Sequence, residues 1–162
     1  MTTPVRRNLG ILLTLVIALS LSVIAMPAAL TATRPEWVAM AIIYWSMALP
    51  RRVGLGTAWV TGLLLDVLTG SLLGQHALAL TVVAYLSIRT HQRVRVYPLW
   101  QQSIAVGLML VVYRILLLWV YGITGHAPDQ RAYWIPVLTS MLLWPLIFLL
   151  LRHIRRRLHL TG

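Results

Sequence analysis

Cysteine and lysine are absent from this chain of 162 residues, and only three of its residues are acidic. Without cysteine the chain forms no disulfide, no reactive thiolate and no cysteine-ligated metal site. Its five histidines are scattered, and none stands with a second histidine and a carboxylate at ligand spacing. No Gly-x-Ser-x-Gly elbow or phosphate-binding loop occurs, and the serines in apolar stretches lack a His or Lys base at helical spacing. We therefore expect no enzyme activity, no metal and no cofactor.

Apolar residues dominate the chain. Hydrophobic residues are 59% of it, charged residues 10%, and the mean hydropathy is +0.81. A soluble domain is roughly half apolar and about a quarter charged, so the composition indicates an all-α integral membrane protein. Its connections are of roughly ten residues or fewer, which predicts one six-helix domain over residues 1–162. The six predicted transmembrane helices lie at residues 9–26, 36–49, 53–68, 75–88, 99–122 and 133–151.

The first two stretches allow other interpretations. Arg6 and Arg7 followed by an apolar run also fit a cleaved signal peptide, although the run is long and the cleavage pattern near Pro27 is poor. The second stretch would cover about 21 Å of helix, against a hydrocarbon core of about 30 Å. A re-entrant hairpin there would place Arg51 and Arg52 in lipid, which is costly. We therefore interpret both stretches as spans.

Arginine marks every second gap between the apolar stretches. The other gaps hold only Arg34 and Arg131. Because short loops rich in Lys or Arg stay in the cytoplasm, both termini are predicted to be cytoplasmic. The formal net charge of +11 does not indicate nucleic-acid binding, because a nucleic-acid footprint covers one face or helix. Arg6 and Arg7 precede the first stretch on the same side. The predicted topology and lipid-headgroup anchors are Arg51, Arg52, Arg89, Arg93, Arg95, Arg152, Arg155, Arg156 and Arg157.

The basic segment 152–157 has a second interpretation. Besides anchoring the chain to lipid headgroups, it could form a docking surface for an acidic cytoplasmic partner. The sixth apolar stretch, which precedes this segment, contains Pro145, which is expected to kink the helix.

Two charges fall inside the predicted spans. A carboxylate within a span usually faces the protein interior or a water-filled path. Asp66 lies about 20 Å from the basic end of its span and Arg114 about 22 Å from the basic end of its own, so both fall in the same outer half of the bilayer. We therefore predict an Asp66–Arg114 ion pair. A contact with a ligand or partner, or proton transport through Asp66, are the alternatives.

Small residues recur every fourth position in the third stretch, at Gly54, Ala58, Gly62 and Gly70, with Asp66 completing the series. Small residues four apart let two membrane helices approach closely. The stripe predicts a helix-packing face inside the bundle or, alternatively, a face for a ligand or a partner helix.

Several short strings of residues, in this order and spacing, resemble the MreD family of rod shape-determining proteins of Gram-negative bacteria. The resemblance extends from about Arg34 to Arg157. The strings are Arg34-Pro35-Glu36-Trp37, Tyr44-Trp45, Ala48-Leu49-Pro50-Arg51-Arg52-Val53, Gly56-Thr57, Gly62-x-x-x-Asp66-x-x-x-Gly70-x-x-Leu73-Gly74, Leu99-Trp100-Gln101-Gln102, and Leu143-Trp144-Pro145 with Phe148 and Arg152.

The resemblance implies a non-enzymatic component of the machinery for lateral cell-wall elongation, located in the bacterial inner membrane. Its direct partner is expected to be MreC, and its indirect partners MreB, RodA and the elongation transpeptidase. The six-helix fold is expected to be similar to the substrate-binding subunits of vitamin uptake transporters. Arg114 departs from the family pattern, which has an acidic residue near this position.

A protein of this composition can act by holding other helices. We expect a scaffold that captures the transmembrane helix of MreC in a groove near the Gly54–Gly62 stripe, so that replacing Gly62 by Leu disrupts the association. A small-molecule binding or transport subunit is the alternative function. An intramembrane enzyme or lipid flippase is a third possibility, for which the residues give no sign.

Overall fold

The computed structural model describes residues 3–158, whose regular secondary structure is helix only, without a strand. The predicted all-α class is confirmed. Residues 1–2 and 159–162, which the predicted domain included, lie outside the described residues. The helices are α1 (Thr3–Val23), α2 (Ala28–Thr31), α3 (Trp37–Ala48), α4 (Leu55–Thr69), α5 (Gln75–Val94), α6 (Leu99–Thr124), α7 (Gln130–Tyr133) and α8 (Ile135–Arg157).

The six longer helices occupy the six apolar stretches, but three of them extend further into polar sequence. Helix α1 begins at Thr3, six residues before the apolar run that starts at Leu9. Helix α5 continues to Val94 and α8 to Arg157, through the arginines that follow their apolar runs. Arginine is a good helix former, and cations in the last turn interact favourably with the helix dipole. The loss of apolar character therefore does not end these helices.

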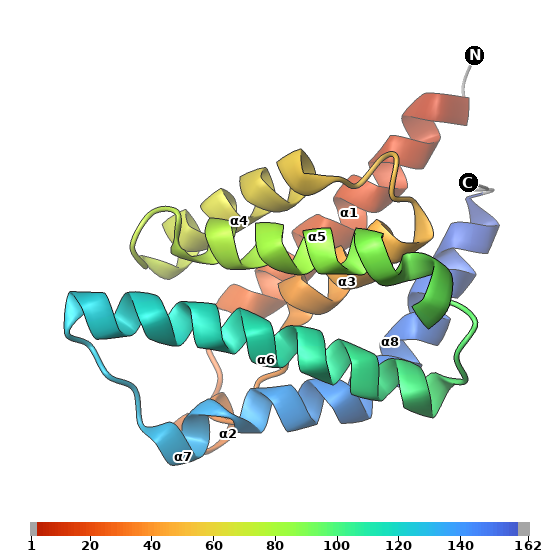
Figure 1. Cartoon of the computed structure of the whole chain (residues 1–162). Helices are drawn as coiled ribbons and strands as arrows, with labels where there is room; N and C mark the ends of the chain where they lie inside the picture. The colour runs from red at the N-terminus through yellow and green to blue at the C-terminus, as the bar shows by residue number, and fades with distance from the viewer. Residues whose placement is uncertain (1–2, 159–162) are drawn as a thin grey trace.

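The helices run back and forth along one axis, so that alternate connections meet at the same end. Figure 1 shows both termini, the α3–α4 connection and the α5–α6 connection at one end of the molecule, and the α4–α5 turn and the α6–α7 loop at the other. The arginine-rich segments therefore gather at one end, which we call the basic end. The opposite end, which carries α2 and α7, is called the outer end.

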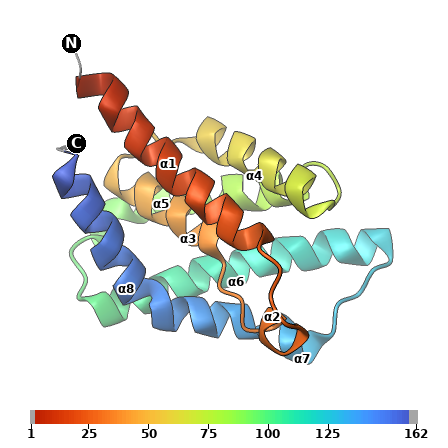
Figure 2. The same ribbon diagram turned by 180° about the vertical axis from the view of Figure 1, so that it is seen from behind.

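Helix α3 lies at the centre of the bundle and packs against α1, α5, α6 and α8. Figure 2, the view from behind, shows α1 passing in front of α3. Every residue of α3 from Val38 to Ala48 is buried, as expected for a helix that is hydrophobic on all sides. Its 12 residues span about 18 Å, less than the hydrocarbon core of about 30 Å. Protein rather than lipid surrounds this helix, which explains how so short a segment is accommodated.

Three of the described helical segments are long and apolar enough to cross a membrane, namely Pro4–Val23, Leu99–Thr124 and Gln130–Arg157. Helices α3 and α4 are apolar but shorter. The count of six spans stays a prediction. Helix α8 contains Pro145, which provides no N–H for the helix ladder, and Figure 2 shows α8 changing direction along its length.

The small residues of the α4 stripe have two different roles: two of them pack inside the bundle, and two lie at the ends of the helix. Ala58 and Gly62 are buried, and the backbone of Ala77 in α5 approaches Gly62 so closely that an added Cβ would lie 2.3 Å from the Ala77 Cα. Gly54 and Gly70 instead bound α4 and have open space beside them. Gly62 therefore packs against α5 of the same chain, and the expected MreC contact near the Gly54–Gly62 stripe stays a prediction.

Three glycine-to-alanine variants test this close approach. Gly62→Ala should lower the unfolding free energy by about 2 kcal/mol, because a backbone has to move. Gly107→Ala should cost less, since its added Cβ would meet the flexible side chain of Met141. Gly122→Ala, in open space on α6, should be stabilising by up to about 1 kcal/mol. Thermal unfolding of the purified full chain in detergent measures the series, and equal stability of the Gly62 and Gly122 variants would contradict the packing.

Candidate functional site

Asp66 is 1% exposed and lies in the last turn of α4. Its carboxylate accepts hydrogen bonds from the Ser71 hydroxyl at 2.8 Å, the Gly74 backbone N–H at 2.8 Å and the His76 backbone N–H at 2.9 Å. The Nδ1 atom of His76 lies 2.7 Å from Oδ1 of Asp66. The carboxylate therefore satisfies several polar groups at the start of α5, where negative charge is favourable.

The α4–α5 turn brings these donors to Asp66. Gly70 has a φ of 66° and Gly74 a φ of 96°, both in the left-handed region that glycine adopts without strain. Between them the chain reverses direction, so that α5 returns along α4. Asp66 thus connects two helices through their turn, and its contacts are those of a structural cap.

A second charged cluster joins α3, α6 and the α7–α8 region at the outer end. The Nη2 atom of Arg114 donates to Oε1 of Glu36, and the two side chains are 14% and 18% exposed. The guanidinium lies over the Tyr133 ring, 4.7 Å from its centroid, and the Tyr133 hydroxyl donates to the Arg114 carbonyl at 2.6 Å. The Glu36 N–H donates to the Ser140 hydroxyl at 2.9 Å. This Glu36 cluster fixes the first residue before α3 to three other elements.

The predicted Asp66–Arg114 pair needs correction, because the structure gives each residue a different partner. Asp66 pairs with His76, and Arg114 pairs with Glu36. Both charges lie toward the outer end, as their depths predicted, but α5 lies between α4 and α6 (Figure 1). Residue counting gives depth along a helix and says nothing of rotation around it. The short length of α3 could have indicated the position of Glu36. A short central helix ends deeper in the bundle than the longer helices around it, so the residue before its start is partly buried.

The described residues contain no group of three or more His, Cys, Asp or Glu side chains that could hold a metal ion. The third acidic residue, Asp129, accepts from the Arg131 N–H at 3.2 Å and caps α7. Each of the three carboxylates therefore satisfies neighbouring groups of its own chain, and all three lie at or near the outer end.

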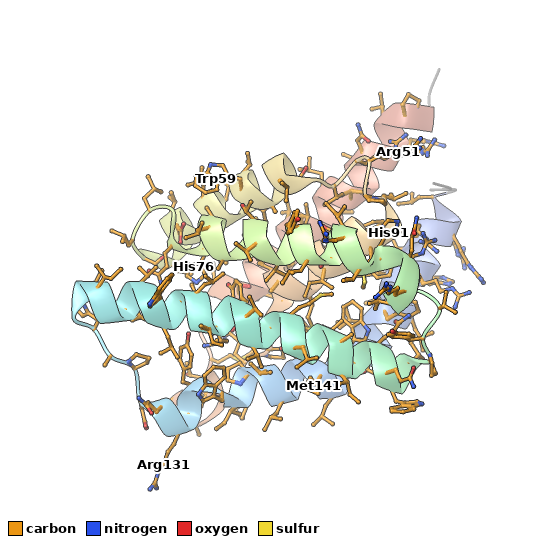
Figure 3. The ribbon with its side chains drawn as sticks, viewed as in Figure 1. Arg51, Trp59, His76, His91, Arg131 and Met141 are labelled. Carbon is orange, nitrogen blue, oxygen red and sulfur yellow. The ribbon has the colours of Figure 1, made fainter. Side chains whose placement is uncertain are left out.

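The predicted arginine anchors lie at the basic end. Figure 3 shows Arg51 and His91 at this end and Arg131 at the opposite one. Arg51 and Arg52 are exposed in the α3–α4 connection, whereas Arg93 and Arg155–Arg157 belong to the last turns of α5 and α8. Arg52 donates to the Asn8 side chain at 2.9 Å. Their role as membrane anchors stays a prediction.

Two separate open hollows of about 340 and 370 Å³ lie one after the other along α1, on the side of the bundle where α4 lies beside it. The first hollow is near the basic end and includes Leu12, Leu15 and Thr57. The second is near the outer end and includes Val16, Leu19 and Leu68. From Asn8 to Val23 the lining residues of α1 extend over about 22 Å of helix. We call this surface the α1–α4 groove. It could not be predicted from the sequence, which indicated only a stripe of small residues on α4.

Comparison with known proteins identifies one family. The family model described as "rod shape-determining protein MreD" matches residues 5–154. A curated relative, the rod shape-determining protein MreD of Haemophilus influenzae, is 34% identical over 148 residues, which are 90% of this chain and 90% of the relative. No solved structure matches the chain.

Two double-mutant cycles distinguish the observed ion pair from the one predicted from sequence. Glu36→Gln and Arg114→Gln should each destabilise the chain, and together should show a coupling energy of about 1–3 kcal/mol because the side chains are in contact. The matched cycle of Asp66→Asn with Arg114→Gln should be additive within about 0.5 kcal/mol. Unfolding in detergent measures both cycles; stronger coupling in the second would restore the Asp66–Arg114 pair.

Proposed function

Because the chain belongs to the MreD family of rod shape-determining proteins, we propose that it is a non-enzymatic scaffold of the cell-wall elongation complex. It binds MreC and, by organising lateral peptidoglycan synthesis, helps to maintain the rod shape. Its association with MreB, RodA and the elongation transpeptidase is indirect. Family membership is the observation that carries this proposal.

The scaffold is a multi-pass protein of the bacterial inner membrane, with its basic end in the cytoplasm. Two features support this arrangement. The arginine-rich segments gather at one end of the bundle (Figure 1), as positive-inside orientation requires. The six longest helices, including the short α3, also run back and forth between the two ends, so that both termini come to the same side.

The transmembrane helix of MreC occupies the α1–α4 groove. Large apolar side chains such as Leu12, Val16 and Leu68 are exposed there, and the groove extends most of the length of α1. A lipid bilayer gives little hydrophobic drive to helix association, so shape complementarity has to supply it. Open hollows in a lateral surface offer more packing contact to a single helix than a flat face would.

The alternative function, a small-molecule binding or transport subunit, has less support. Helix α3 fills the centre of the bundle with buried side chains such as Tyr44 and Trp45. Drug-sized ligands need pockets of about 300–1,000 Å³ that enclose most of their surface, whereas the two hollows of this size are open and face sideways. The expected similarity to vitamin transporter subunits stays a prediction.

Cysteine cross-linking tests the groove. The chain has no cysteine, so Leu12→Cys or Leu68→Cys introduces a single thiol. Each is paired in membranes with single cysteines scanned along the MreC transmembrane helix. We expect disulfides at every third or fourth MreC position, with Leu12 and Leu68 selecting opposite ends of that helix. Leu142→Cys, on α8 and 82% exposed, is the control and should form none.

A cell-shape assay tests the scaffold itself. Cells depleted of this protein should become round, and the wild-type chain should restore rods. Thr57→Trp, which fills the hollow near the basic end, should fail to restore them although the protein reaches the membrane at normal level. Leu142→Trp should restore them. Rods without any copy of the chain would refute the scaffold function, whereas full rescue by Thr57→Trp would refute only the groove.

A further inference from the structure

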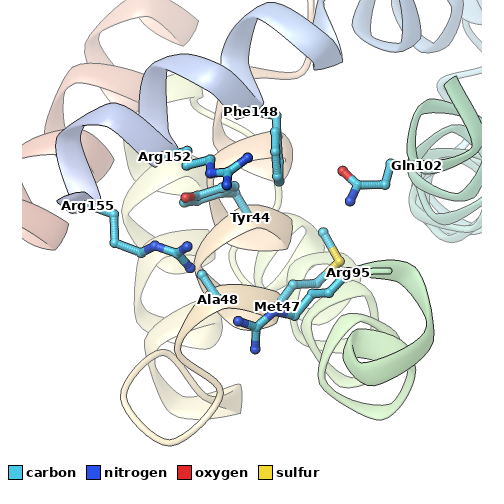
Figure 4. Close-up of a pocket in the computed structure, with 8 residues that line it drawn as sticks. All are labelled: Tyr44, Met47, Ala48, Arg95, Gln102, Phe148, Arg152 and Arg155. Carbon is cyan, nitrogen blue, oxygen red and sulfur yellow. The ribbon is translucent and has the colours of Figure 1, made fainter. Parts of the chain in front are cut away.

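A cavity of about 200 Å³ opens at the basic end between α3, α6 and α8, beside the end of α5. Three arginines, a glutamine and the hydroxyl of a tyrosine form its polar lining, and apolar groups complete it. Figure 4 shows Arg152 and Arg155 reaching in from α8, with Arg95 and Gln102 on other sides. The lining residues are Tyr44, Met47, Ala48, Arg95, Gln102, Phe148, Arg152 and Arg155.

Two buried polar groups in this cavity lack partners. Tyr44 is 2% exposed and Gln102 is 3% exposed. The Tyr44 hydroxyl and the Gln102 Oε1 atom have no hydrogen bond to any described residue, although the Gln102 Nε2 atom donates to the Val94 carbonyl at 3.1 Å. A buried polar group without a partner is destabilising, because it has lost its hydrogen bonds to water. Both groups therefore call for a polar ligand in the cavity.

The positive charge of the cavity indicates that the ligand is an anion. The chain has only three acidic side chains, and Glu36, Asp66 and Asp129 are all engaged elsewhere. No side-chain carboxylate is thus left to face Arg95, Arg152 and Arg155. Guanidinium groups bind phosphate through paired, charge-assisted hydrogen bonds, and the Tyr44 hydroxyl is a further donor.

The position of the cavity specifies the source of the anion. It lies where the apolar run of α8 gives way to Arg152 and where α6 begins. Trp100 and Tyr97 are exposed at this level, as aromatic residues at a membrane interface are. Basic pockets between transmembrane helices on the cytoplasmic side suit phospholipid headgroups. About 200 Å³ is too little for a drug-sized ligand.

We propose that this cavity is a specific binding site for the phosphodiester of an anionic phospholipid from the cytoplasmic leaflet. Arg95, Arg152 and Arg155 bind the phosphate, and the Tyr44 hydroxyl donates to it. Gln102 Oε1 accepts from a hydroxyl of a glycerol headgroup. This site differs from the diffuse attraction of exposed arginines, because it selects one lipid molecule.

Native mass spectrometry of the full chain, with dioleoyl phosphatidylglycerol or dioleoyl phosphatidylcholine added to the micelles, tests the site. Wild type should retain one phosphatidylglycerol and release phosphatidylcholine. Arg152→Gln with Arg155→Gln should weaken retention by roughly tenfold or more. Arg156→Gln with Arg157→Gln removes the same charge from exposed positions outside the cavity and should leave retention unchanged. Equal loss in both double variants would overturn the proposal.

Tyr44→Phe provides a readout that a purely structural role would not give. Removal of an unpartnered buried hydroxyl should stabilise the lipid-free protein slightly, while the rise in Tm on adding phosphatidylglycerol should shrink. Inorganic phosphate is the second probe. If it raises the Tm as much as the lipid does, the site takes free phosphate and the lipid assignment falls. Tighter binding of an acidic peptide than of phosphatidylglycerol would likewise overturn it, in favour of a cytoplasmic partner.

Discussion

The ion pair between Glu36 and Arg114 holds the outer end of the central helix, and the bundle depends on it because α1, α5, α6 and α8 all pack against α3. A short helix surrounded by protein has no lipid contact to set its depth. The Glu36 cluster sets that depth with one charge pair, one stacked Tyr133 ring and the hydroxyl of Ser140. At the other side of α3, the indole of Trp45 donates to Thr14 of α1 at 2.9 Å. Directional polar contacts thus fix the depth of α3, which apolar packing alone would leave free to shift along the helix axis.

The charges of this chain are divided between its two ends, and the ends have different roles. The outer end uses its carboxylates internally, in the α4–α5 turn, the Glu36 cluster and the cap of α7. The basic end is rich in arginine, and none of the three acidic side chains lies there. At the outer end the carboxylates are neutralised within the chain, whereas the basic end can attract anions from outside the chain. A scaffold in a membrane has use for both properties, since one end holds the bundle together and the other meets the cytoplasmic surface.

The positions of the helices could be predicted from the sequence, whereas their partners could not. Apolar runs mark helices because no other element satisfies its backbone in lipid, and a helix end such as Gly70 is signalled by glycine. The depth of Asp66 and Arg114 followed from the rise per residue. Their pairing depends on how each helix is rotated and on which helix lies between them, and neither is encoded locally. The cavity lined by Tyr44 at the basic end was likewise missed. Arg95 follows α5, Arg152 and Arg155 belong to α8, and the unpartnered hydroxyl of Tyr44 belongs to α3.

The brevity and complete burial of α3 also bear on how the protein is made. Twelve residues are too few to partition stably into a bilayer as an isolated segment. Helix α3 is therefore not stable in the membrane before the helices that pack against it are inserted. Its stable placement requires that α1 already be in the membrane and that α5 arrive soon after, since these helices cover its sides. Biogenesis of this protein is therefore expected to be cooperative, with the core helix committed only once later segments have emerged from the ribosome.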